Sequence, residues 1–327
     1  MTTMTSLYGG LGPQWQQCRI PVPEPGPGQV LVRARAAALN NADAVVLDQC
    51  FDPATGKGSE YLAGYEFAGD VAAVGDGVTA PAVGERVMGI TEGAFAPYVL
   101  ADHRHVIGMP NGLGFEEAAT LPTALSTEYG ALTTAGFRPG QSVLITGATA
   151  AIGLVGVQIA KHLGASTVLA TTRTTAKADL LKEVGSDTVI VTAEQDLTAA
   201  VLDATRGDGV DVVLDHVGGP IFAACLPATR VDGHVVNIGR LDTAASTIDL
   251  DALSYRHLTL HGVSYGFSRP VELGNAVAAL DNEVLPAVTD GRIRPLVDSV
   301  YDLDRAPQAL ARLRSHQAHG KVVLRLS

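Results

Sequence analysis

A turn of small residues connects an apolar run to an apolar helix pattern in the middle of the chain. The run, residues 143–145, has the length of a buried strand, and apolar residues recur at helical spacing across residues 152–163. A helix that starts directly after such a turn directs its unpaired N–H groups and the positive end of its dipole at the turn, which favours a bound phosphate group. We therefore predict a dinucleotide site whose pyrophosphate contacts Thr149, Ala150, Ala151, Ile152 and Gly153.

The glycine pattern of this turn is incomplete. The dinucleotide pattern G-x-G-x-x-G would place glycines at positions 148, 150 and 153, and only Gly153 is present. The prediction of a nucleotide site therefore depends on the order of strand, turn and helix. The alternative is an ordinary strand-to-helix turn of an α/β protein.

The next predicted strand, residues 167–171, ends in a stretch with two cations and no acid. A site selective for NAD carries Asp or Glu at this place to bind the ribose hydroxyls, whereas an NADP site offers cations and hydroxyls to the additional phosphate. We predict that the 2′-phosphate of NADPH is held by Thr172, Arg173, Thr174 and Lys177. The alternative is that both cations are solvated charges at a helix start, where the helix dipole disfavours them.

Three later strand ends supply the remaining candidate contacts. Residues 215–219 and 238–240 each follow an apolar strand and contain glycine, and a third turn follows residue 262. We assign the ribose and nicotinamide contacts to Val217, Gly218, Ile238, Gly239, Arg240, Val263 and Ser264. Taken singly, each motif is equally typical of a plain Gly-rich turn.

The elements that must position these turns alternate regularly along the chain. Strands are predicted at residues 143–145, 167–171, 188–191, 210–214, 234–238 and 257–262, and helices at residues 115–121, 127–135, 152–163, 175–184, 197–205 and 221–228. Such alternation predicts a doubly wound parallel sheet with helices on both faces. Its ligands bind beyond the carboxyl ends of the strands, where the strand order reverses.

The rest of the chain predicts a second domain. About the first 110 residues alternate short apolar runs with Gly and Pro, a texture of short strands and turns. Near the carboxyl end, a helix is predicted at residues 305–315 and an extended run at residues 321–326. We expect this segment to complete the β-rich domain formed by the start of the chain. The predicted fold class is α/β, with a β-rich domain of residues 1–112 and 263–327 and a doubly wound domain of residues 113–262.

Composition excludes several classes of protein. With 46% hydrophobic and 17% charged residues in 327, the chain has the composition of an ordered protein that is long enough for two cores. The net charge of −11 disfavours a nucleic-acid partner, and no apolar run approaches the roughly 20 residues of a membrane span. Three widely spaced cysteines do not form a disulfide framework. We expect a soluble cytoplasmic protein without a nucleic-acid or membrane partner.

Several stretches, taken together, resemble one known family. They are residues 38–43 (ALNNAD), 64–89 (GYEFAGDVAAVGDGVTAPAVGERVMG), 116–132 (EEAATLPTALSTEYGAL), the turn described first, 209–219 (GVDVVLDHVGG), 233–239 (GHVVNIG) and 320–324 (GKVVL). In this order the chain resembles the medium-chain dehydrogenase/reductase superfamily, in its zinc-free quinone oxidoreductase-like (zeta-crystallin-like) branch. The resemblance implies a GroES-like catalytic domain built from both chain ends, a central Rossmann domain that binds NADPH, and an active site in the cleft between them.

At several positions the chain differs from the family that it resembles. Zinc-dependent relatives carry a Cys just before the segment that starts at Asn40 and a His where this chain has Tyr65, so we expect no metal site. Relatives in the zinc-free branch usually have glycines where Ala150 and Ala151 stand here. Alanine disfavours positive φ angles. Either the backbone needs no positive φ there, or the cofactor is held farther away and more weakly.

Candidate catalytic residues follow from the family positions. Asn40 and Thr127 match an asparagine and a threonine placed near the nicotinamide, and we predict that both contact the cofactor and serve catalysis. Tyr65 and Tyr129 are candidates for lining the cleft. The alternatives are a turn Asn, a helix-cap Thr and ordinary aromatic packing. No tyrosine follows Asn40 closely, so the resemblance identifies no proton donor.

Without a zinc ion to polarise a carbonyl, the expected acceptor is already electron-poor. We predict NADPH-dependent hydride transfer to a quinone or a related activated alkene, by a homodimer that pairs residues 257–263 of two subunits. The alternatives are an enoyl-thioester or enone reductase of a biosynthetic pathway, and an NADPH-binding protein without turnover.

Overall fold

The computed structural model describes residues 2–326, which form two compact units. Unit 1 contains the described residues up to Thr123, residues 266–285 and the described residues from Pro295 on, and unit 2 contains residues 124–265 and 286–294. The limits of the catalytic and cofactor domains that the sequence suggested, 112/113 and 262/263, stay a prediction. The chain passes between the two units at 123/124, 265/266, 285/286 and 294/295.

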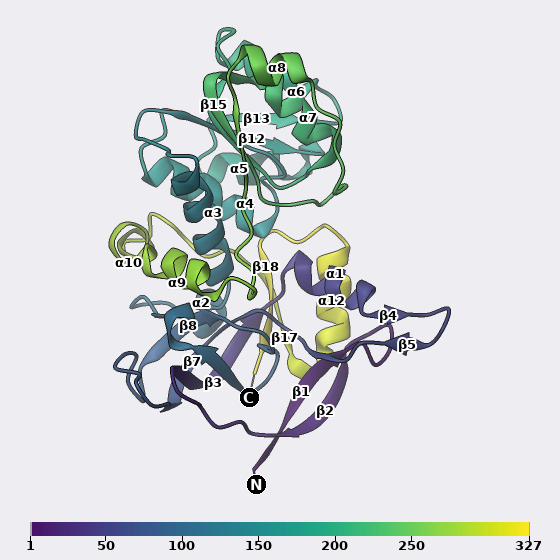
Figure 1. Ribbon diagram of the computed structural model, residues 1–327, viewed down its shortest axis with the longest axis vertical. Coiled ribbons are helices and arrows are strands. Elements are labelled where there is room, and N and C mark those ends of the chain that lie inside the picture. Colours follow the sequence, from purple (N-terminus) through teal and green to yellow (C-terminus); the bar gives the residue numbers. More distant parts are fainter. Residues whose placement is uncertain (1, 327) are drawn as a thin grey trace. The chain divides into compact units, whose positions relative to one another are not determined.

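Unit 2 is built on a six-stranded parallel sheet in the order β13-β12-β11-β14-β15-β16 (Figure 1). The strands are β11 (Ser142–Ile145), β12 (Thr167–Thr172), β13 (Thr188–Val191), β14 (Val210–Asp215), β15 (Thr229–Asn237) and β16 (Thr259–Gly262). All five neighbouring pairs run parallel. The strand order therefore reverses between β11 and β14, and a doubly wound sheet binds its ligand at such a reversal.

The helices of unit 2 alternate with these strands, as the sequence predicted. They are α3 (Pro122–Thr134), which starts in unit 1, α4 (Ala151–His162), α5 (Ala178–Glu183), α6 (Leu197–Ala204), α7 (Gly219–Ala228), α8 (Leu250–Tyr255) and α11 (Leu285–Thr289), which also starts in unit 1. Helix α4 is buried on every side from Gly153 to Ala160, because it directly follows the central strand β11. The predicted fold class, α/β with a Rossmann sheet, is confirmed.

Unit 2 contains a helix that was not predicted, and its last strand begins later than predicted. Helix α8 was not predicted, because none of its residues is buried and no apolar stripe marks it. The last strand begins at Thr259 and not at residue 257, since His257 adopts a positive φ of 50° that interrupts an extended backbone.

Unit 1 contains a seven-stranded sheet that joins both ends of the chain. Its main path is β10-β8-β7-β3-β18-β17, and β9 also pairs with β3. The strands are β3 (Gln29–Ala38), β7 (Glu66–Val74), β8 (Arg86–Ile90), β9 (Tyr98–Asp102), β10 (Val106–Gly108), β17 (Val297–Asp302) and β18 (Lys321–Arg325). Because β18 pairs antiparallel with β3, the carboxyl-terminal segment lies within the amino-terminal sheet.

Smaller elements complete unit 1. A second sheet in the order β2-β1-β6 consists of β1 (Thr3–Gly9), β2 (Gln16–Pro21) and β6 (Tyr61–Leu62), and a short pair of β4 (Phe51–Asp52) and β5 (Lys57–Gly58) follows α1. The helices are α1 (Asn41–Gln49), α2 (Phe115–Ala118), α9 (Pro270–Ala278), α10 (Leu280–Glu283) and α12 (Ala306–Arg314). The sequence did not predict α1, because only Asp43 and Leu47 of this helix are buried.

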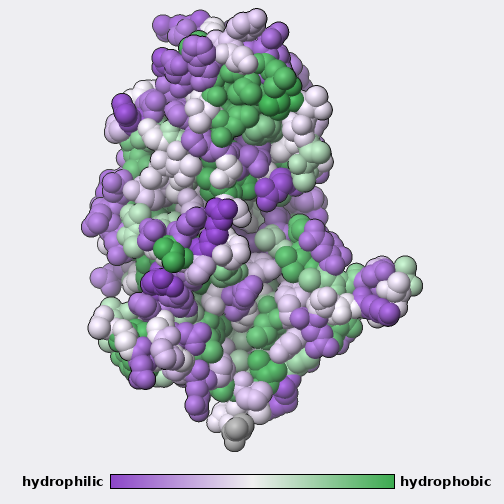
Figure 2. Space-filling model, viewed as in Figure 1, coloured by the Kyte–Doolittle hydropathy of each residue, from purple (hydrophilic) through white to green (hydrophobic). Residues whose placement is uncertain are grey.

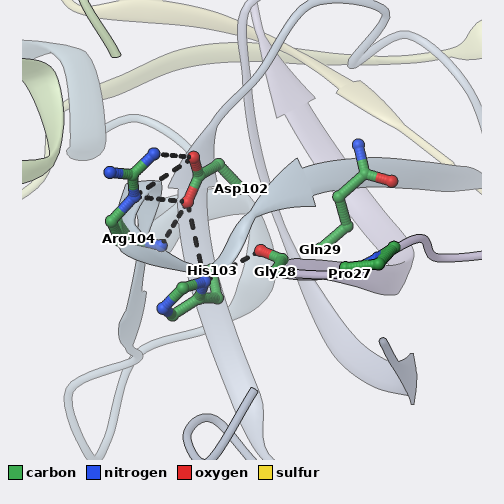
Figure 3. Close-up of a pocket in the computed structure, with 6 residues that line it drawn as sticks. All are labelled: Pro27, Gly28, Gln29, Asp102, His103 and Arg104. Atoms are coloured by element: carbon green, nitrogen blue, oxygen red, sulfur yellow. Dashed lines mark hydrogen bonds and ion pairs between the residues drawn. The ribbon is translucent and has the colours of Figure 1, made fainter. Parts of the chain in front are cut away.

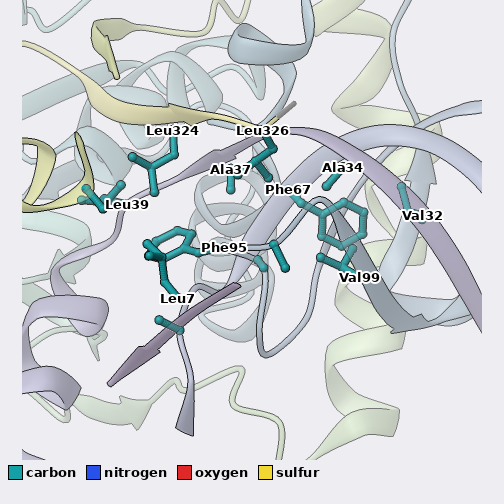
Figure 4. Packing of buried hydrophobic residues seen from close by; sticks show 14 of the residues in the cluster. Leu7, Val32, Ala34, Ala37, Leu39, Phe67, Phe95, Val99, Leu324 and Leu326 are labelled. Atoms are coloured by element: carbon teal, nitrogen blue, oxygen red, sulfur yellow. The ribbon is translucent and has the colours of Figure 1, made fainter. Parts of the chain in front are cut away.

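One apolar core fills unit 1. Figure 4 shows side chains from distant segments meeting there: Leu7 of β1, Phe67 of β7, Phe95, and Leu324 and Leu326 near the carboxyl end. Each of them is less than 5% exposed. The burial of large side chains from both chain ends stabilises the sheet in which β18 lies between β3 and β17.

The face of the molecule drawn in Figure 2 carries mostly a mixture of polar and apolar side chains. Figure 2 shows one larger apolar area, which lies over the part of unit 2 where Figure 1 labels α6 and α7. None of the helices formed by residues 2–326 has the length and apolar character required to cross a membrane.

Candidate functional site

Hydrogen bonds and packing hold the turn after β11 in one backbone shape. Gly147 adopts a positive φ of 57°, which favours glycine. Its N–H donates to the Thr171 hydroxyl at 2.9 Å, and the Ala148 N–H donates to the Thr171 carbonyl at 3.1 Å. A Cβ atom at Gly147 would also lie 3.0 Å from Val217 Cγ2. The turn is thus held between the ends of β12 and β14.

The two alanines in this turn cause no backbone strain. Ala150 is extended, with φ −66° and ψ 149°, and Ala151 is the first residue of α4. The glycine that packing requires is Gly153, because a Cβ atom there would lie 2.8 Å from Ala148 Cα. Of the two explanations offered for the missing glycines, the structure supports the first: no positive φ is needed at these positions.

The start of α4 fits a pyrophosphate group. No side chain caps this helix at Ala150. The first-turn N–H groups of a helix have no partners within the helix, and the positive end of its dipole lies there. Ala150 and Ala151 are only partly buried, and their small side chains leave the backbone open to approach by a ligand. The residues predicted for the pyrophosphate therefore form one continuous segment with the required chemistry.

The four residues predicted to hold a 2′-phosphate lie at the end of β12 and just after it, and they differ in solvent exposure. Thr172 is buried, and its hydroxyl donates to the Thr174 carbonyl at 2.9 Å. That hydroxyl hydrogen therefore holds the loop in shape. Arg173 and Thr174 are exposed, and Lys177 is half-buried. No Asp or Glu lies between Thr171 and Ala178, so a phosphate at this loop meets no like charge from it.

A buried carboxylate, that of Asp215, joins three strand ends. It accepts hydrogen bonds from the Thr146 hydroxyl (2.7 Å), the Gly218 N–H (3.0 Å) and the Asn237 amide (3.0 Å). The Val217 N–H donates to it at 3.2 Å. These partners follow β11 and β14 or end β15, so Asp215 fixes the ends of all three strands at the reversal of strand order. Sequence reasoning missed this role, although an acid that directly follows an apolar strand was a visible signal.

The remaining predicted contacts lie at the ends of β15 and β16. The N–H groups of Ile238 and Gly239 donate to the Asp215 carbonyl, at 2.8 and 3.0 Å. A Cβ atom at Gly239 would lie 2.4 Å from the His216 carbonyl oxygen, so packing requires glycine there. Arg240 is exposed, as is Ser264, whereas Val263 is buried. Unit 2 thus gathers the predicted residues of five strand ends at one edge of its sheet.

The other two predicted residues of unit 2 lie on α3. Thr127 is half-buried, and Tyr129 is 8% exposed. They flank Glu128, which is fully buried. The predicted Asn40 and Tyr65 belong to unit 1.

Asn40 lies just before α1 and belongs to a buried polar cluster. Its side-chain nitrogen donates to Glu66 Oε1 at 2.9 Å, and its side-chain oxygen accepts from Lys321 Nζ at 2.5 Å. A carboxylate only accepts and an ammonium group only donates, so these two partners fix the orientation of the amide. The Asp43 carboxyl group also interacts with the Asn40 side chain, so the amide is held by several groups of the protein.

Lys321 and Glu66 form an ion pair with almost no solvent exposure. Their side chains are 4% and 0% exposed, and Lys321 Nζ donates directly to Glu66 Oε1. The backbone N–H of Thr123 donates to the second carboxylate oxygen at 3.0 Å. Sequence reasoning missed this pair; the signal was a charged residue at the start of each of two strands, directly before a run of apolar or small residues.

Asp43 is the second buried acid of this cluster. Its side chain accepts the Asn40 N–H at 2.7 Å, and the residue is only 2% exposed. Burial raises the pKa of Asp43 to about 7, although the Asn40 N–H and the charge of Lys321 act in the opposite direction. The cluster therefore gains or loses a proton near neutral pH.

Tyr65 packs against Phe267, with ring centroids 5.8 Å apart. Burial, together with the nearby charge of Asp43, raises the pKa of Tyr65 well above its usual value. The phenol therefore stays protonated at neutral pH. Across residues 2–326, no group of three or more His, Cys, Asp or Glu side chains is arranged to hold a metal ion.

A surface pocket of about 470 Å³ in unit 1 is separate from every predicted site residue. Figure 3 shows Asp102 and Arg104 on one side and Gly28 on the other. Arg104 forms an ion pair with Asp102 at 2.5 Å, and His103 Nδ1 donates to the Gly28 carbonyl at 2.8 Å. The polar groups of this pocket thus already pair with one another.

Two family models match the chain. The alcohol dehydrogenase GroES-like domain covers residues 26–111, and the zinc-binding dehydrogenase model covers residues 151–281. A GroES-like unit together with a Rossmann unit is the architecture of a class of nicotinamide-dependent oxidoreductases. The chain belongs to the medium-chain dehydrogenase/reductase superfamily.

The relatives among solved structures and curated proteins include quinone oxidoreductases and polyketide synthases. A mycobacterial quinone oxidoreductase is 27% identical, with a TM-score of 0.85 over 98% of this chain and 99% of that one. A mycobacterial protein, Rv1454c, solved in complex with NADPH, is 28% identical, with a TM-score of 0.85 over 98% of this chain and all of that one. Quinone oxidoreductase-like protein 2 of Bos taurus is 28% identical over 81% of this chain and 76% of its own length.

Several of the relatives are polyketide synthases. Polyketide synthase GfsB of Streptomyces halstedii is 32% identical over 95% of this chain, and the pikromycin polyketide synthase component PikAII of Streptomyces venezuelae is 34% identical over 90%. The chain spans only 5% and 8% of the length of these two proteins.

Proposed function

We propose that this oxidoreductase transfers a hydride from NADPH to a quinone or a related activated alkene. The observation that carries the proposal is the turn after β11, which presents the uncapped start of α4 beside the reversal of strand order. The quinone oxidoreductases among the relatives support the acceptor class, and the NADPH complex of Rv1454c supports the cofactor. When bound, NADPH supplies the hydride.

The residues of unit 2 bind and orient the cofactor in this proposal. The backbone of Thr149, Ala150, Ala151, Ile152 and Gly153 holds the pyrophosphate, and Arg173 and Lys177, with Thr174, hold the 2′-phosphate. The turns that contain Val217, Gly218, Ile238, Gly239, Arg240, Val263 and Ser264 accommodate the ribose and the nicotinamide. Thr172 contributes by fixing the loop that presents Arg173.

Four side chains are proposed to serve catalysis. Asn40 presents to the ligand an amide group whose orientation is fixed by Lys321 and Glu66. Thr127 contacts the nicotinamide, and Tyr65 and Tyr129 exclude water from the reacting groups. A reduced quinone needs no protein acid, because its oxygen atoms take their protons from water.

The double substitution of Arg173 and Lys177 by Ala tests the cofactor assignment. Two charge-assisted hydrogen bonds to a phosphate contribute roughly 1.5–3 kcal/mol each, so we expect the affinity for NADPH to fall at least 10-fold. The affinity for NADH, which lacks the 2′-phosphate, should change little. Fluorescence titration of both cofactors gives the two dissociation constants, and an equal effect on both would exclude the 2′-phosphate contact.

The acceptor class is tested by NADPH oxidation with 1,4-benzoquinone, simple enones and crotonyl thioesters. We expect turnover with the quinone. Activity on the thioester alone would overturn the proposed acceptor. Tight binding of NADPH without reduction of any acceptor would instead identify a binding protein without turnover.

One observation favours a second candidate, an enoyl-thioester or enone reductase of a biosynthetic pathway. The polyketide synthases are 32–34% identical to this chain, whereas the quinone oxidoreductase-like proteins are 26–28% identical. The matched segment is a small part of each synthase. The same acceptor series separates this candidate from the first.

We also propose that two subunits pair along β16. This strand is the outermost one of its sheet, and Leu260 at its centre is 37% exposed. An exposed edge strand offers unpaired N–H and C=O groups to a second copy. Light scattering should give a dimer mass, and Leu260→Lys should lower it to that of the monomer, because an edge lysine opposes strand pairing. A monomeric wild-type protein would contradict the proposal.

A further inference from the structure

A hydrogen bond buried inside unit 2 joins Glu128 of α3 to His216, the first residue after β14. Glu128 Oε1 and His216 Nε2 are 2.6 Å apart, and the side chains are 0% and 2% exposed. Glu128 lies between Thr127 and Tyr129, and His216 directly precedes Val217. The bond therefore connects two segments that carry proposed site residues.

His216 is also tied to the strand on its other side. Its backbone N–H donates to the Thr146 hydroxyl at 3.0 Å, and its Nδ1 lies 2.9 Å from the Thr146 carbonyl oxygen. A carbonyl oxygen only accepts, so Nδ1 carries a hydrogen. The bond between Nε2 and Glu128 then contains one proton, bound either to the imidazole or to the carboxyl group. With that proton, the pair has no net charge.

The space for the Glu128 carboxyl group is provided by a glycine of α4. A Cβ atom at Gly156 would lie 2.3 Å from Glu128 Oε2. That oxygen is buried and has no hydrogen-bond partner. The carboxyl group thus lies between α3, α4 and the turn after β14, with His216 as its one polar anchor, and the loss of this anchor would leave a buried acid unpaired.

We propose that Glu128 and His216 act as a positioning pair. Their bond holds α3, with Thr127 and Tyr129, in a fixed place relative to the turn of Val217 and Gly218. This inference rests on the proposed function, which assigns both segments to the nicotinamide end of the cofactor. Hydride transfer depends steeply on the placement of the reacting groups, and a misplacement of about 1 Å reduces a rate roughly 100-fold.

The pair adds a pH dependence to the proposed activity. Burial by itself lowers the pKa of His216, but the charge and hydrogen bond of Glu128, with the Thr146 carbonyl and the charge of Asp215, raise it overall. Glu128 from α3 and Asp215 from β14 are the charged groups that act on the imidazole, whereas Thr146, which follows β11, and Gly156 of α4 bear no charge. A group with a raised pKa keeps its stabilising effect at lower pH and loses it as the pH rises through that value. The activity should therefore fall at alkaline pH, when Nε2 and the carboxylate no longer share a proton.

Two substitutions of one residue separate positioning from bulk stability. In Glu128→Gln the amide hydrogen donates to Nε2, so the contact remains without a titrating proton. We expect this variant to keep kcat within about 3-fold at neutral pH and to lose the alkaline decline. Glu128→Ala removes the contact, and we expect its kcat to fall about 10- to 100-fold. Glu183→Gln, the same change at an exposed position of α5, is the matched control and should match the wild type.

The measurements are the single-turnover rate of NADPH oxidation against pH and hydrogen exchange of residues 127–129 and 216–219. Faster exchange in Glu128→Ala, but not in Glu128→Gln, supports the pair. Unchanged exchange and rate in folded Glu128→Ala, or an alkaline decline retained in Glu128→Gln, overturns it. If the wild type reduces no acceptor, the proposed function fails, and the exchange measurement alone still decides whether the pair positions these segments. If Glu128→Ala does not fold, the exchange and pH profile of Glu128→Gln decide.

Discussion

Replacement of Lys321 by methionine is expected to lower the free energy of unfolding by about 3–5 kcal/mol, the usual effect of removing one partner of a buried ion pair. Methionine has a similar length but no charge, so Glu66 would stay buried without its counter-ion. The Asn40 side-chain oxygen would lose its donor as well. Urea unfolding of the purified protein, followed by circular dichroism, measures the change in the midpoint.

The control for this prediction is Lys182→Met. Lys182 forms an exposed pair with Asp179, whose side chains are 64% and 90% exposed, and such pairs contribute about 0–1 kcal/mol. A double variant that also carries Glu66→Gln should recover part of the loss, because it removes the unpaired charge. Equal midpoints for Lys321→Met and Lys182→Met would show that the buried pair does not stabilise unit 1.

Replacement of Asp43 by asparagine is expected to change how stability depends on pH. The pKa of Asp43 is about 7 in the folded protein and 3.8 in an unfolded chain, so the folded state binds the extra proton between these values. Stability therefore falls as the pH rises from about 4 to about 7, by about 4 kcal/mol at full effect. Asparagine cannot ionise, and its oxygen still accepts the Asn40 N–H.

Unfolding midpoints of the wild type and the Asp43→Asn variant, measured from pH 4 to pH 8, test this expectation. The two curves should agree most closely at the acid end and separate as the pH rises, with the variant more stable at pH 8. Asp208→Asn, a change of the same kind at an exposed position, should follow the wild type throughout. Parallel curves for Asp43→Asn and the wild type would show that Asp43 is ionised in both states.

Unit 2 was predictable because its information is local. Each strand is a short apolar run, each helix has its own periodicity, and the turn from Gly147 to Gly153 contains its own backbone requirements. The sequence also raised the question of whether the backbone at Ala150 and Ala151 needs positive φ angles. Its answer, an extended Ala150 and a helical Ala151, required backbone angles that composition does not specify.

The buried polar groups were not predictable in the same way. Asn40, Glu66 and Lys321 come together from three distant segments, and only the pairing of β3 with β7 and β18 places them in one cluster. The sequence offered Asn40 through a family resemblance, but nothing local to Lys321 indicated its partner. Glu128 and His216 are likewise 88 residues apart, and their bond depends on how α3 packs in unit 2.

The role of Asp215 has a consequence for the thermodynamics of cofactor binding. Its carboxylate accepts hydrogen bonds from residues at the ends of β11, β14 and β15. These hydrogen bonds order the three strand ends in the protein itself. The loops are thus preorganised, and the conformational entropy of ordering them is lost during folding and not during association. Binding to such a surface resembles docking onto a rigid template, so the proposed cofactor, NADPH, should associate without the large heat-capacity change that accompanies coupled folding.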